Sequence, residues 1–358
     1  MTRIKAPARI CLFGDHQDYL GLPVIACAIN RYIEFNALPN SSNTLCFDFI
    51  DLNEKRSVNL DQQYNNFGPR DYIRSSLYLL QQRGIQLESG YDIEVYGNIP
   101  INAGLSSSSA FVVAWITLLL KLSNKLNDYT AVQIGQMAYE AECVLHKESG
   151  GKMDQYTAAI GSTVYIDTSR DLSYESLIFP TDALLVANSG IPKATLDGLR
   201  MLNERTHAAI AKVTQQYPNL EVAKVSLGAL GQYLKFLDEA QSLLFEAAVR
   251  NHTLTLEAVK GIRLGTADPS FLGALMFEHH KVLRDFLKIT TPEIDALINA
   301  AMEAGAFGCK IVGSGGGGCI ACIAPRAKRD EILSALEAAG ASVAFEAMIS
   351  EGAKELAK

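Results

Sequence analysis

The sequence contains no run of eighteen apolar residues, so it predicts no membrane-spanning helix. Charged residues stand near its start at Arg3 and Lys5, but the apolar core of a secretory signal peptide does not follow them. It also has no basic run, and the net charge of −7 argues against a nucleic-acid partner. These absences predict a cytoplasmic protein that acts on a small molecule, without a membrane or nucleic-acid partner. They leave the oligomeric state open.

Cysteine is sparse and shows no pairing pattern. The seven cysteines are an odd number and lie scattered in apolar segments, which is typical of reduced thiols in a cytosolic core. Cys319 and Cys322 form a CxxC pair, but a zinc site would need a second pair of ligands. The surrounding Cys-Ile-Ala-Cys-Ile-Ala instead indicates a buried strand.

Internal repeats, low-complexity segments and long linkers are also absent. A length of 358 residues with 48% hydrophobic content favours two domains, each with its own core. The strand expected over residues 183–188 opens the second domain. We therefore predict domains at 1–178 and 179–358.

Residues 102–110, Asn-Ala-Gly-Leu-Ser-Ser-Ser-Ser-Ala, are the most informative stretch of the chain. An alternating strand pattern precedes them at 91–96, and an apolar helix pattern follows at 111–120, with Ser108 or Ser109 near the N-cap. This order directs unpaired N–H groups toward one point, where the helix dipole favours an anion by about 0.3–1 kcal/mol. We expect a nucleotide phosphate there, with a serine hydroxyl available to its magnesium ion. The turn lacks the Gly-Lys-Ser/Thr of a Walker A motif, and an ordinary serine-rich N-cap is the alternative.

Two further candidate residues lie on and just after an expected amphipathic helix over 128–147. Its apolar stripe comprises Ile134, Met137, Ala138, Ala141, Val144 and Leu145, and Glu142 falls beside that stripe. The glycine-containing segment 149–156 then presents Asp154.

Three segments in order carry a family resemblance: Lys5–Tyr19, the serine turn, and the glycine run Lys310–Cys319. With them the chain resembles the GHMP kinases, which include galactokinase, homoserine kinase, mevalonate kinase and phosphomevalonate kinase. The resemblance implies an α+β, mixed α/β fold with two lobes. The N-terminal lobe would bind the nucleotide, the C-terminal lobe would be ferredoxin-like and carry the glycine run, and the active site would lie in the cleft between them.

The resemblance also implies roles for individual residues. Asp154 matches the aspartate of the galactokinase pattern Gly-x-Met-Asp-Gln and would face the acceptor hydroxyl as base or orienter. Arg9 matches the arginine of Ala-Pro-Gly-Arg and would hold Asp154 ionised while stabilising phosphate charge. Glu142, twelve residues before Asp154, would bind magnesium together with Ser108. The residues expected to contact ATP are Gly104, Leu105, Ser106, Ser107, Ser108, Ser109 and Tyr72. Taken singly, Asp154 has an alternative role as a helix cap, Arg9 as a surface ion pair and Glu142 as a solvated side chain.

Substrate residues are implied by Gly14–Tyr19, which is similar to the galactokinase signature Gly-Glu-His-Thr-Asp-Tyr. That signature's acidic residues and histidine bind sugar hydroxyls, so the resemblance implies a sugar site made by Asp15, His16, Asp18, Tyr19 and Gly151. His16 as a satisfied core histidine is the alternative.

Several positions depart from the galactokinase pattern. Asp15 is one methylene shorter than the glutamate, Ala8 replaces a glycine, and Leu20-Gly21-Leu22-Pro23 replaces an asparagine-rich continuation. The glycine run is closer to that of mevalonate and heptose kinases, and residues 191–195 resemble a mevalonate kinase segment. These differences affect the choice of acceptor and not the type of reaction.

We therefore expect an ATP- and Mg²⁺-dependent kinase that phosphorylates the anomeric hydroxyl of galactose or a related monosaccharide, giving sugar 1-phosphate and ADP. The alternatives are a mevalonate kinase or another GHMP sugar kinase, acting on heptose, arabinose, fucose or glucuronate. A non-catalytic sugar and ATP sensor is a third possibility. Such sensors commonly lose part of the serine turn or a catalytic residue, whereas this sequence keeps them all.

Overall fold

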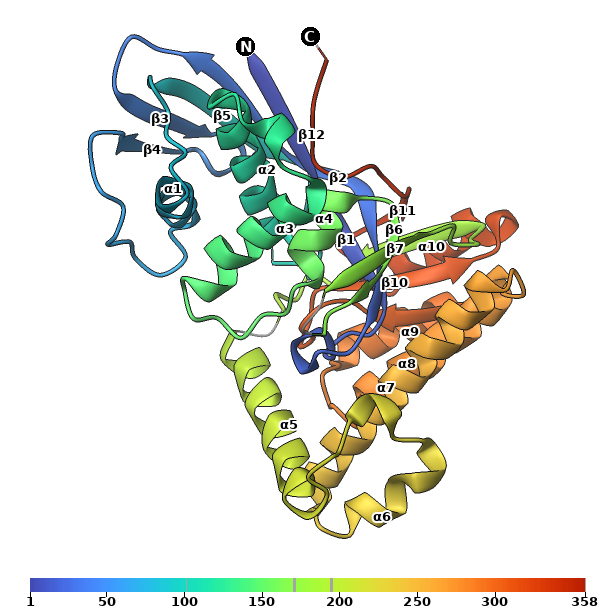
Figure 1. The fold of residues 1–358 in the computed structure, drawn as a ribbon. Coiled ribbons are helices and arrows are strands. Elements are labelled where there is room, and N and C mark those ends of the chain that lie inside the picture. Colours follow the sequence, from blue (N-terminus) through green and yellow to red (C-terminus); the bar gives the residue numbers. More distant parts are fainter. Residues whose placement is uncertain (101, 170–171, 194–195, 358) are drawn as a thin grey trace.

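The computed structural model describes residues 1–100, 102–169, 172–193 and 196–357, which form two β-sheets covered by helices (Figure 1). The first sheet has eight strands in the order β12-β1-β2-β5-β3-β4, with β6 also pairing with β2, and β7 with β6. The second sheet has four strands in the order β11-β8-β10-β9. The predicted two-lobed mixed α/β fold is therefore confirmed.

The first sheet is built on two long antiparallel strands, and their pairing runs from Thr2–Ala37 to Phe13–Ile25. Its strands are β1 (Thr2–Phe13), β2 (Val24–Pro39), β3 (Thr44–Phe49), β4 (Glu54–Asn59), β5 (Tyr91–Gly97), β6 (Thr163–Asp167), β7 (Ser173–Leu177) and β12 (Lys354–Glu355). The helices of this lobe are α1 (Tyr72–Gln82), α2 (Ser107–Leu122), α3 (Ala131–Tyr139) and α4 (Met153–Ile160).

The second sheet is antiparallel throughout. Its strands are β8 (Ala183–Asn188), β9 (Gly308–Ile311), β10 (Cys319–Ala324) and β11 (Val343–Ala347). The helices of this half are α5 (Leu196–Gln216), α6 (Leu230–Leu234), α7 (Glu239–Arg263), α8 (Pro269–Asp285), α9 (Pro292–Glu303) and α10 (Arg329–Ala338). In Figure 1, α5 and α6 extend away from both sheets at the lower end of the molecule.

The chain passes from the first sheet to the second between β7 and β8, and we propose that the lobe boundary lies there, at 178–179. The C-terminal segment then returns to the first sheet. Ile349 forms a bridge with Ile29, and β12 pairs with β1.

Strand β10 explains how the two lobes pack. Cys319, Ala321 and Ile323 face a core that β1 residues also line, whereas Ile320, Cys322 and Ala324 face a second core against the helices. Because successive side chains of a strand point to opposite faces, a strand between two cores must be apolar at every position. The predicted buried strand is confirmed, and all seven cysteines are free thiols.

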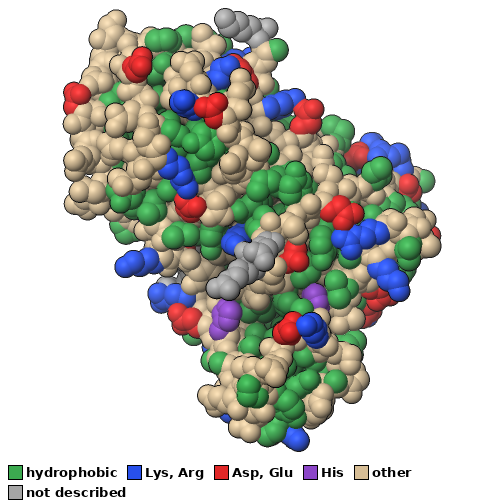
Figure 2. All heavy atoms as spheres, in the orientation of Figure 1, with side chains coloured by type: hydrophobic (Ala, Val, Ile, Leu, Met, Phe, Trp, Pro, Cys, Tyr) green, Lys and Arg blue, Asp and Glu red, His purple; other side chains and the backbone are tan. Residues whose placement is uncertain are grey.

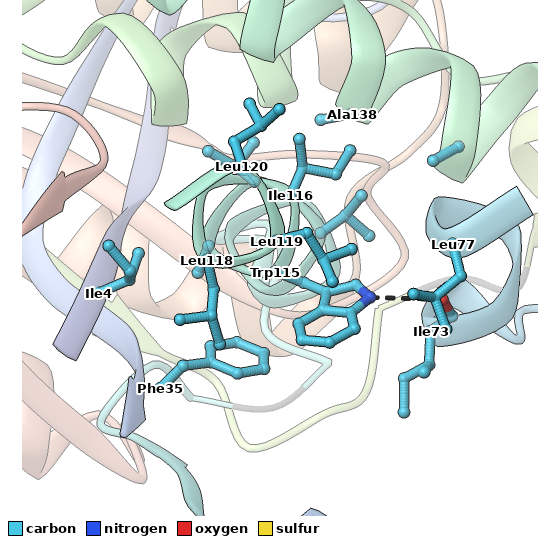
Figure 3. Packing of buried hydrophobic residues seen from close by; sticks show 14 of the residues in the cluster. Ile4, Phe35, Ile73, Leu77, Trp115, Ile116, Leu118, Leu119, Leu120 and Ala138 are labelled. Atoms are coloured by element: carbon cyan, nitrogen blue, oxygen red, sulfur yellow. Dashed lines mark hydrogen bonds between the residues drawn. The ribbon is translucent and has the colours of Figure 1, made fainter. Parts of the chain in front are cut away.

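Helix α2 is the centre of the first lobe's core (Figure 3). Trp115 is fully buried, lies 5.8 Å from the Phe35 ring, and donates its indole N–H to the Ile73 carbonyl at 3.3 Å. A helix that is apolar on every side must be buried on every side, and this burial holds the N-terminus of α2 in one place.

The prediction of a regular helix over 128–147 is wrong in the second half of that range. Regular helix ends at Tyr139, and a π-helical turn follows at Glu140–Val144. The wider turn changes which of its own residues face the core: Glu142 is buried at 5% exposure, whereas Val144, predicted on the apolar stripe, is 52% exposed. π-Turns inside helices occur frequently at functional sites.

Among the described residues, no helix combines the length and apolarity needed to cross a bilayer. On the face drawn in Figure 2, basic and acidic side chains are interspersed.

Candidate active site

The serine turn leads directly into α2, which begins at Ser107. Gly104 and Ser106 both have positive φ, at 81° and 59°. The predicted N-cap at Ser108 or Ser109 is wrong: Ser106 is the N-cap, and its side chain makes no capping hydrogen bond. The backbone N–H groups of Ser107, Ser108 and Ser109 find no acceptor among the described residues. Free N–H groups at a helix N-terminus suit an anion.

The glycine run packs against this turn from the other lobe. The Cys319 N–H donates to the Ala103 carbonyl at 2.9 Å. A Cβ at Gly104 would lie 2.6 Å from the Val312 carbonyl oxygen, and one at Gly318 would lie 2.8 Å from that of Ala103. Only glycine fits at 104 and 318, and the run thereby fixes the position of the turn.

Arg9, on β1, joins the turn to the acidic residue of α4. Its Nε and Nη2 donate to the two carboxylate oxygens of Asp154 at 2.7 and 2.9 Å, and its Nη1 donates to the Gly104 carbonyl at 2.6 Å. The Ser106 hydroxyl also donates to Asp154. Burial would raise the pKa of Asp154, but Arg9 and Ser106 outweigh it and hold that pKa below its usual value. Asp154 is therefore ionised and fixed in orientation.

Glu142 lies beside the serines on the π-helical turn. It accepts a hydrogen bond from the Gln155 amide at 2.7 Å, and the hydroxyls of Ser108 and Ser109 also interact with it. Burial raises its pKa. Among the described residues, no lysine or arginine forms an ion pair with Glu142. The described residues also contain no cluster of three or more His, Cys, Asp or Glu side chains suited to a metal.

The residues of the predicted sugar motif have contrasting surroundings. His16 adopts a positive φ of 62°, and its Nδ1 lies 3.3 Å from the Tyr19 hydroxyl. Its Nε2 is buried without a partner among the described residues. Asp15 forms a buried ion pair with Lys310 at 2.6 Å and accepts the Gly313 N–H at 3.1 Å. Burial opposes ionisation of Asp15, but Lys310 outweighs it and lowers the pKa to about 2.

Asp18 is the second carboxylate beside Asp154. Burial and then the charge of Asp154 raise its pKa to about 6, although the Met153 N–H donates to it at 3.3 Å. A Cβ on Gly151 would lie 1.8 Å from the Asp18 carboxylate. Position 151 therefore has room for glycine alone.

The motifs meet at one cavity, although they lie up to about 300 residues apart in sequence. Leu105 is the one predicted site residue that does not line it; this side chain is buried in the core between the lobes. The others line the cavity together: Arg9, Asp15, His16, Asp18, Tyr19, Tyr72, Gly104, Ser106, Ser107, Ser108, Ser109, Glu142, Gly151 and Asp154.

Three residues of this region were not predicted from the sequence. Gln155 belongs to the same short pattern as Asp154 and bridges Glu142 to Ser109. Lys310, the first residue of the glycine run, anchors Asp15. Lys193 lines the cavity from the second lobe. It belongs to the segment 191–195 that resembles mevalonate kinases, of which positions 194–195 lie outside the described residues.

Family models match three parts of the chain. They are the GHMP kinases N terminal domain at 71–162, the GHMP kinases C terminal at 258–342 and the galactokinase galactose-binding signature at 3–35. The chain belongs to the GHMP kinases. These models cover the sugar motif, the serine turn and the glycine run that meet at the cavity.

Relatives of this GHMP kinase include enzymes of two kinds. The galactokinase of Mannheimia succiniciproducens is 29% identical over 92% of this chain and 86% of its own length. The mevalonate kinase of Thermococcus gammatolerans is 28% identical over 98% of this chain and 96% of its own.

Solved structures show the same fold. Lactococcus lactis galactokinase complexed with galactose matches with a TM-score of 0.88 at 21% identity, covering 99% of this chain and 95% of that one. The mevalonate kinase of Methanococcus jannaschii matches with a TM-score of 0.74 at 21% identity, over 98% of each chain.

Proposed function

We propose that this GHMP kinase transfers the γ-phosphate of ATP to the anomeric hydroxyl of galactose or a closely related monosaccharide, giving sugar 1-phosphate and ADP. The observation that carries the proposal is the double attachment of Arg9, which binds the Asp154 carboxylate and the Gly104 carbonyl at once. This links the acceptor side of the cavity rigidly to the phosphate side. The galactokinase relatives and the galactose-binding signature support a sugar as acceptor.

ATP binds, in this proposal, with its phosphates at the serine turn. The free N–H groups of Ser107, Ser108 and Ser109 and the positive end of the α2 dipole supply the anion site. Tyr72, the first residue of α1 and an expected ATP contact, lines the same cavity.

Magnesium fits the donors beside this turn. Glu142 and the Ser108 hydroxyl are hard oxygen ligands of the kind that Mg²⁺ takes along with phosphate oxygens and water. A buried carboxylate without an ion-pair partner among the described residues also favours a cation. Bound there, Mg²⁺ would neutralise phosphate charge during transfer.

The sugar lies, in this proposal, between Asp154 and the Gly14–Tyr19 segment. The unpartnered Nε2 of His16 and the carboxylate of Asp18 are available to its hydroxyls. Both oxygens of Asp15 already have protein partners, so its predicted sugar contact stays a prediction, and the structure favours His16 and Asp18 for that contact.

Asp154 orients the acceptor hydroxyl and receives its proton late in the reaction. A loose phosphoryl-transfer transition state does not require a strong base, so a carboxylate with a lowered pKa is sufficient. Arg9 keeps that carboxylate ionised and presents positive charge near the transferred group.

Mevalonate is the second candidate acceptor, because mevalonate kinases are about as similar in sequence and the glycine run resembles theirs. A non-catalytic sensor is less favoured, since the expected catalytic residues are present and bonded to each other.

The deciding experiment measures ADP release with Mg-ATP over a panel of galactose, N-acetylgalactosamine, glucose, arabinose, fucose, glucuronate, heptoses and mevalonate. Phosphorus NMR of the product then identifies the phosphorylated position. We expect turnover on galactose or a close relative, with a 1-phosphate product. As a control, Asp154→Asn should bind ATP and sugar yet turn over poorly. Turnover on mevalonate alone would replace the acceptor, and ATP binding without turnover on any substrate would favour the sensor.

A further inference from the structure

We infer that Lys193 binds the transferred phosphate from the second lobe and so completes the positive surroundings of the reacting group. The inference rests on the proposed kinase function, and it adds a cation from the second lobe to the one that Arg9 supplies from the first. Lys193 follows β8, whereas Arg9 and Asp154 belong to the first lobe.

The backbone of Lys193 is held firmly against the phosphate turn. Its N–H donates to the Asn102 carbonyl at 3.1 Å, at the start of that turn. Two residues earlier, the Ile191 carbonyl accepts the Gly318 N–H at 2.8 Å. A Cβ on Gly317 would lie 2.7 Å from the carbonyl oxygens of both Ile191 and Pro192. The glycine run therefore also brings residues 191–193 onto the turn.

Among the described cations that line the cavity, Lys193 is the one without a carboxylate partner. Arg9 is bonded to Asp154 and Gly104, and Arg70 forms an ion pair with Glu148 at 3.2 Å. The half-buried ammonium of Lys193 lines the cavity without an ion pair to any described residue. Burial lowers its pKa, while the charges of Asp154 and Glu142 act in the opposite direction.

A phosphate at the serine turn would supply the anion that Lys193 lacks. The turn itself carries no lysine, unlike a P-loop, whose lysine reaches the β- and γ-phosphates. Phosphoryl transfer depends on positive charge directed at the equatorial oxygens of the moving group. Lys193 reaches the same cavity from the second lobe, so it can supply the positive charge that the turn itself lacks.

The test compares Lys193→Met, which removes the charge but keeps the length, with Lys193→Arg, which keeps the charge. Lys212→Met on α5 is the matched control, since Lys212 is an exposed lysine of the same lobe. Calorimetry gives the dissociation constants of Mg-AMP-PNP and Mg-ADP for each protein, and the ADP-release assay gives kcat and KM. Thermal melting checks that each variant folds.

We expect Lys193→Met to weaken AMP-PNP binding by about tenfold or more while ADP binding changes by less than about twofold, as for loss of one charge-assisted hydrogen bond to the γ-phosphate. Its kcat should fall by about 100-fold with little change in the KM for sugar. Lys193→Arg should keep the preference for the triphosphate analogue, and Lys212→Met should match wild type.

A folded Lys193→Met protein with the wild-type ratio of AMP-PNP to ADP affinity would overturn the inference and leave the kinase proposal standing. If wild-type protein binds nucleotide but phosphorylates nothing, the kinase proposal fails while the affinity ratio still decides the role of Lys193. Absence of nucleotide binding by wild type would overturn both.

Discussion

Gly151 shows how one missing side chain shapes this cavity. A Cβ at this position would lie 1.8 Å from Asp18, whereas a Cβ at the neighbouring Gly150 would meet the Cys143 sulfur at 3.1 Å. Neither glycine has a positive φ, so the difference between them is steric and not conformational.

We therefore predict that Gly151→Ala displaces the Asp18 carboxylate and raises the KM for sugar by about tenfold or more, the loss expected for one hydrogen bond to a charged group. Gly150→Ala is the matched control and should change that KM far less. Steady-state kinetics at saturating ATP measure both. Equal KM values for the two variants would show that Asp18 does not contact the sugar.

The raised pKa of Asp18 predicts that the stability of the protein depends on pH. Its pKa in the folded protein, about 6, lies above the ordinary 3.8, so the folded state holds the proton more tightly than the unfolded state does. This contribution to the free energy of unfolding is complete below pH 3.8 and is lost as the pH rises through 6. Asp18→Asn should therefore be more stable than wild type at pH 7.5, by about 1–2 kcal/mol because the group is only partly buried. The difference should shrink at pH 5. Urea unfolding at both pH values measures it, and a constant difference would contradict the raised pKa.

The π-helical turn places a carboxylate where a regular helix would not. Glu142 is buried on this turn beside Ser108 and Ser109, whereas Glu140 on the same turn pairs with Arg83 nearer the surface. The two glutamates therefore form a natural comparison within one element.

We predict that Glu142→Gln abolishes most of the stabilisation that Mg-AMP-PNP gives over AMP-PNP with EDTA, because the proposed magnesium ligand is lost. Since the folded pKa of Glu142 is raised, its ionisation costs stability at neutral pH, and the variant in EDTA should melt no lower than wild type. Glu140→Gln should keep the magnesium response. Thermal melting provides the readout; an unchanged magnesium response in Glu142→Gln would remove this residue from the metal site.

A buried ion pair joins the two lobes. Lys310 on β9 pairs with Asp15 beyond the end of β1, and both side chains are at most 1% exposed. Lys310 also donates to the Cys11 carbonyl at 2.8 Å. Removing one partner of a buried pair leaves an uncompensated charge, which commonly costs about 3–5 kcal/mol.

We accordingly predict that Lys310→Met lowers the free energy of unfolding by about 3–5 kcal/mol and that Asp15→Asn in the same protein recovers part of the loss. The exposed pair Arg263–Glu175 is the control, and Arg263→Met should cost less than about 1 kcal/mol. The Asp15 pKa of about 2 lies below 3.8, so the pair's contribution is complete above pH 3.8 and lost as the pH falls toward 2. Urea unfolding tests both statements; a Lys310→Met cost no larger than the control would argue against a buried ion pair.

Much of the fold was predictable because its signals are local. Alternation along residues 91–96 predicted β5, and residues 183–188 predicted β8 with the observed bounds. The start of α9 shows the same kind of local signal, because Thr291 precedes Pro292 and its side chain accepts the Ile294 N–H. Caps and periodic patterns depend on a few neighbouring residues, so they can be recognised without knowing the rest of the chain.

The site was predictable as a set of residues but not as a set of contacts. Short motifs indicated Arg9, Asp154 and Glu142, because phosphoryl transfer requires those side chains. The diversion of the Ser106 hydroxyl to Asp154, the π-helical turn, the Asp15–Lys310 pair and the position of Lys193 were not predictable. Each depends on groups that are distant in the sequence and that tertiary packing brings together, over separations of up to 299 residues in the case of the bond from Lys310 to the Cys11 carbonyl. Neighbouring residues in the sequence do not determine such contacts, so they are decided only when tertiary packing brings the distant groups together.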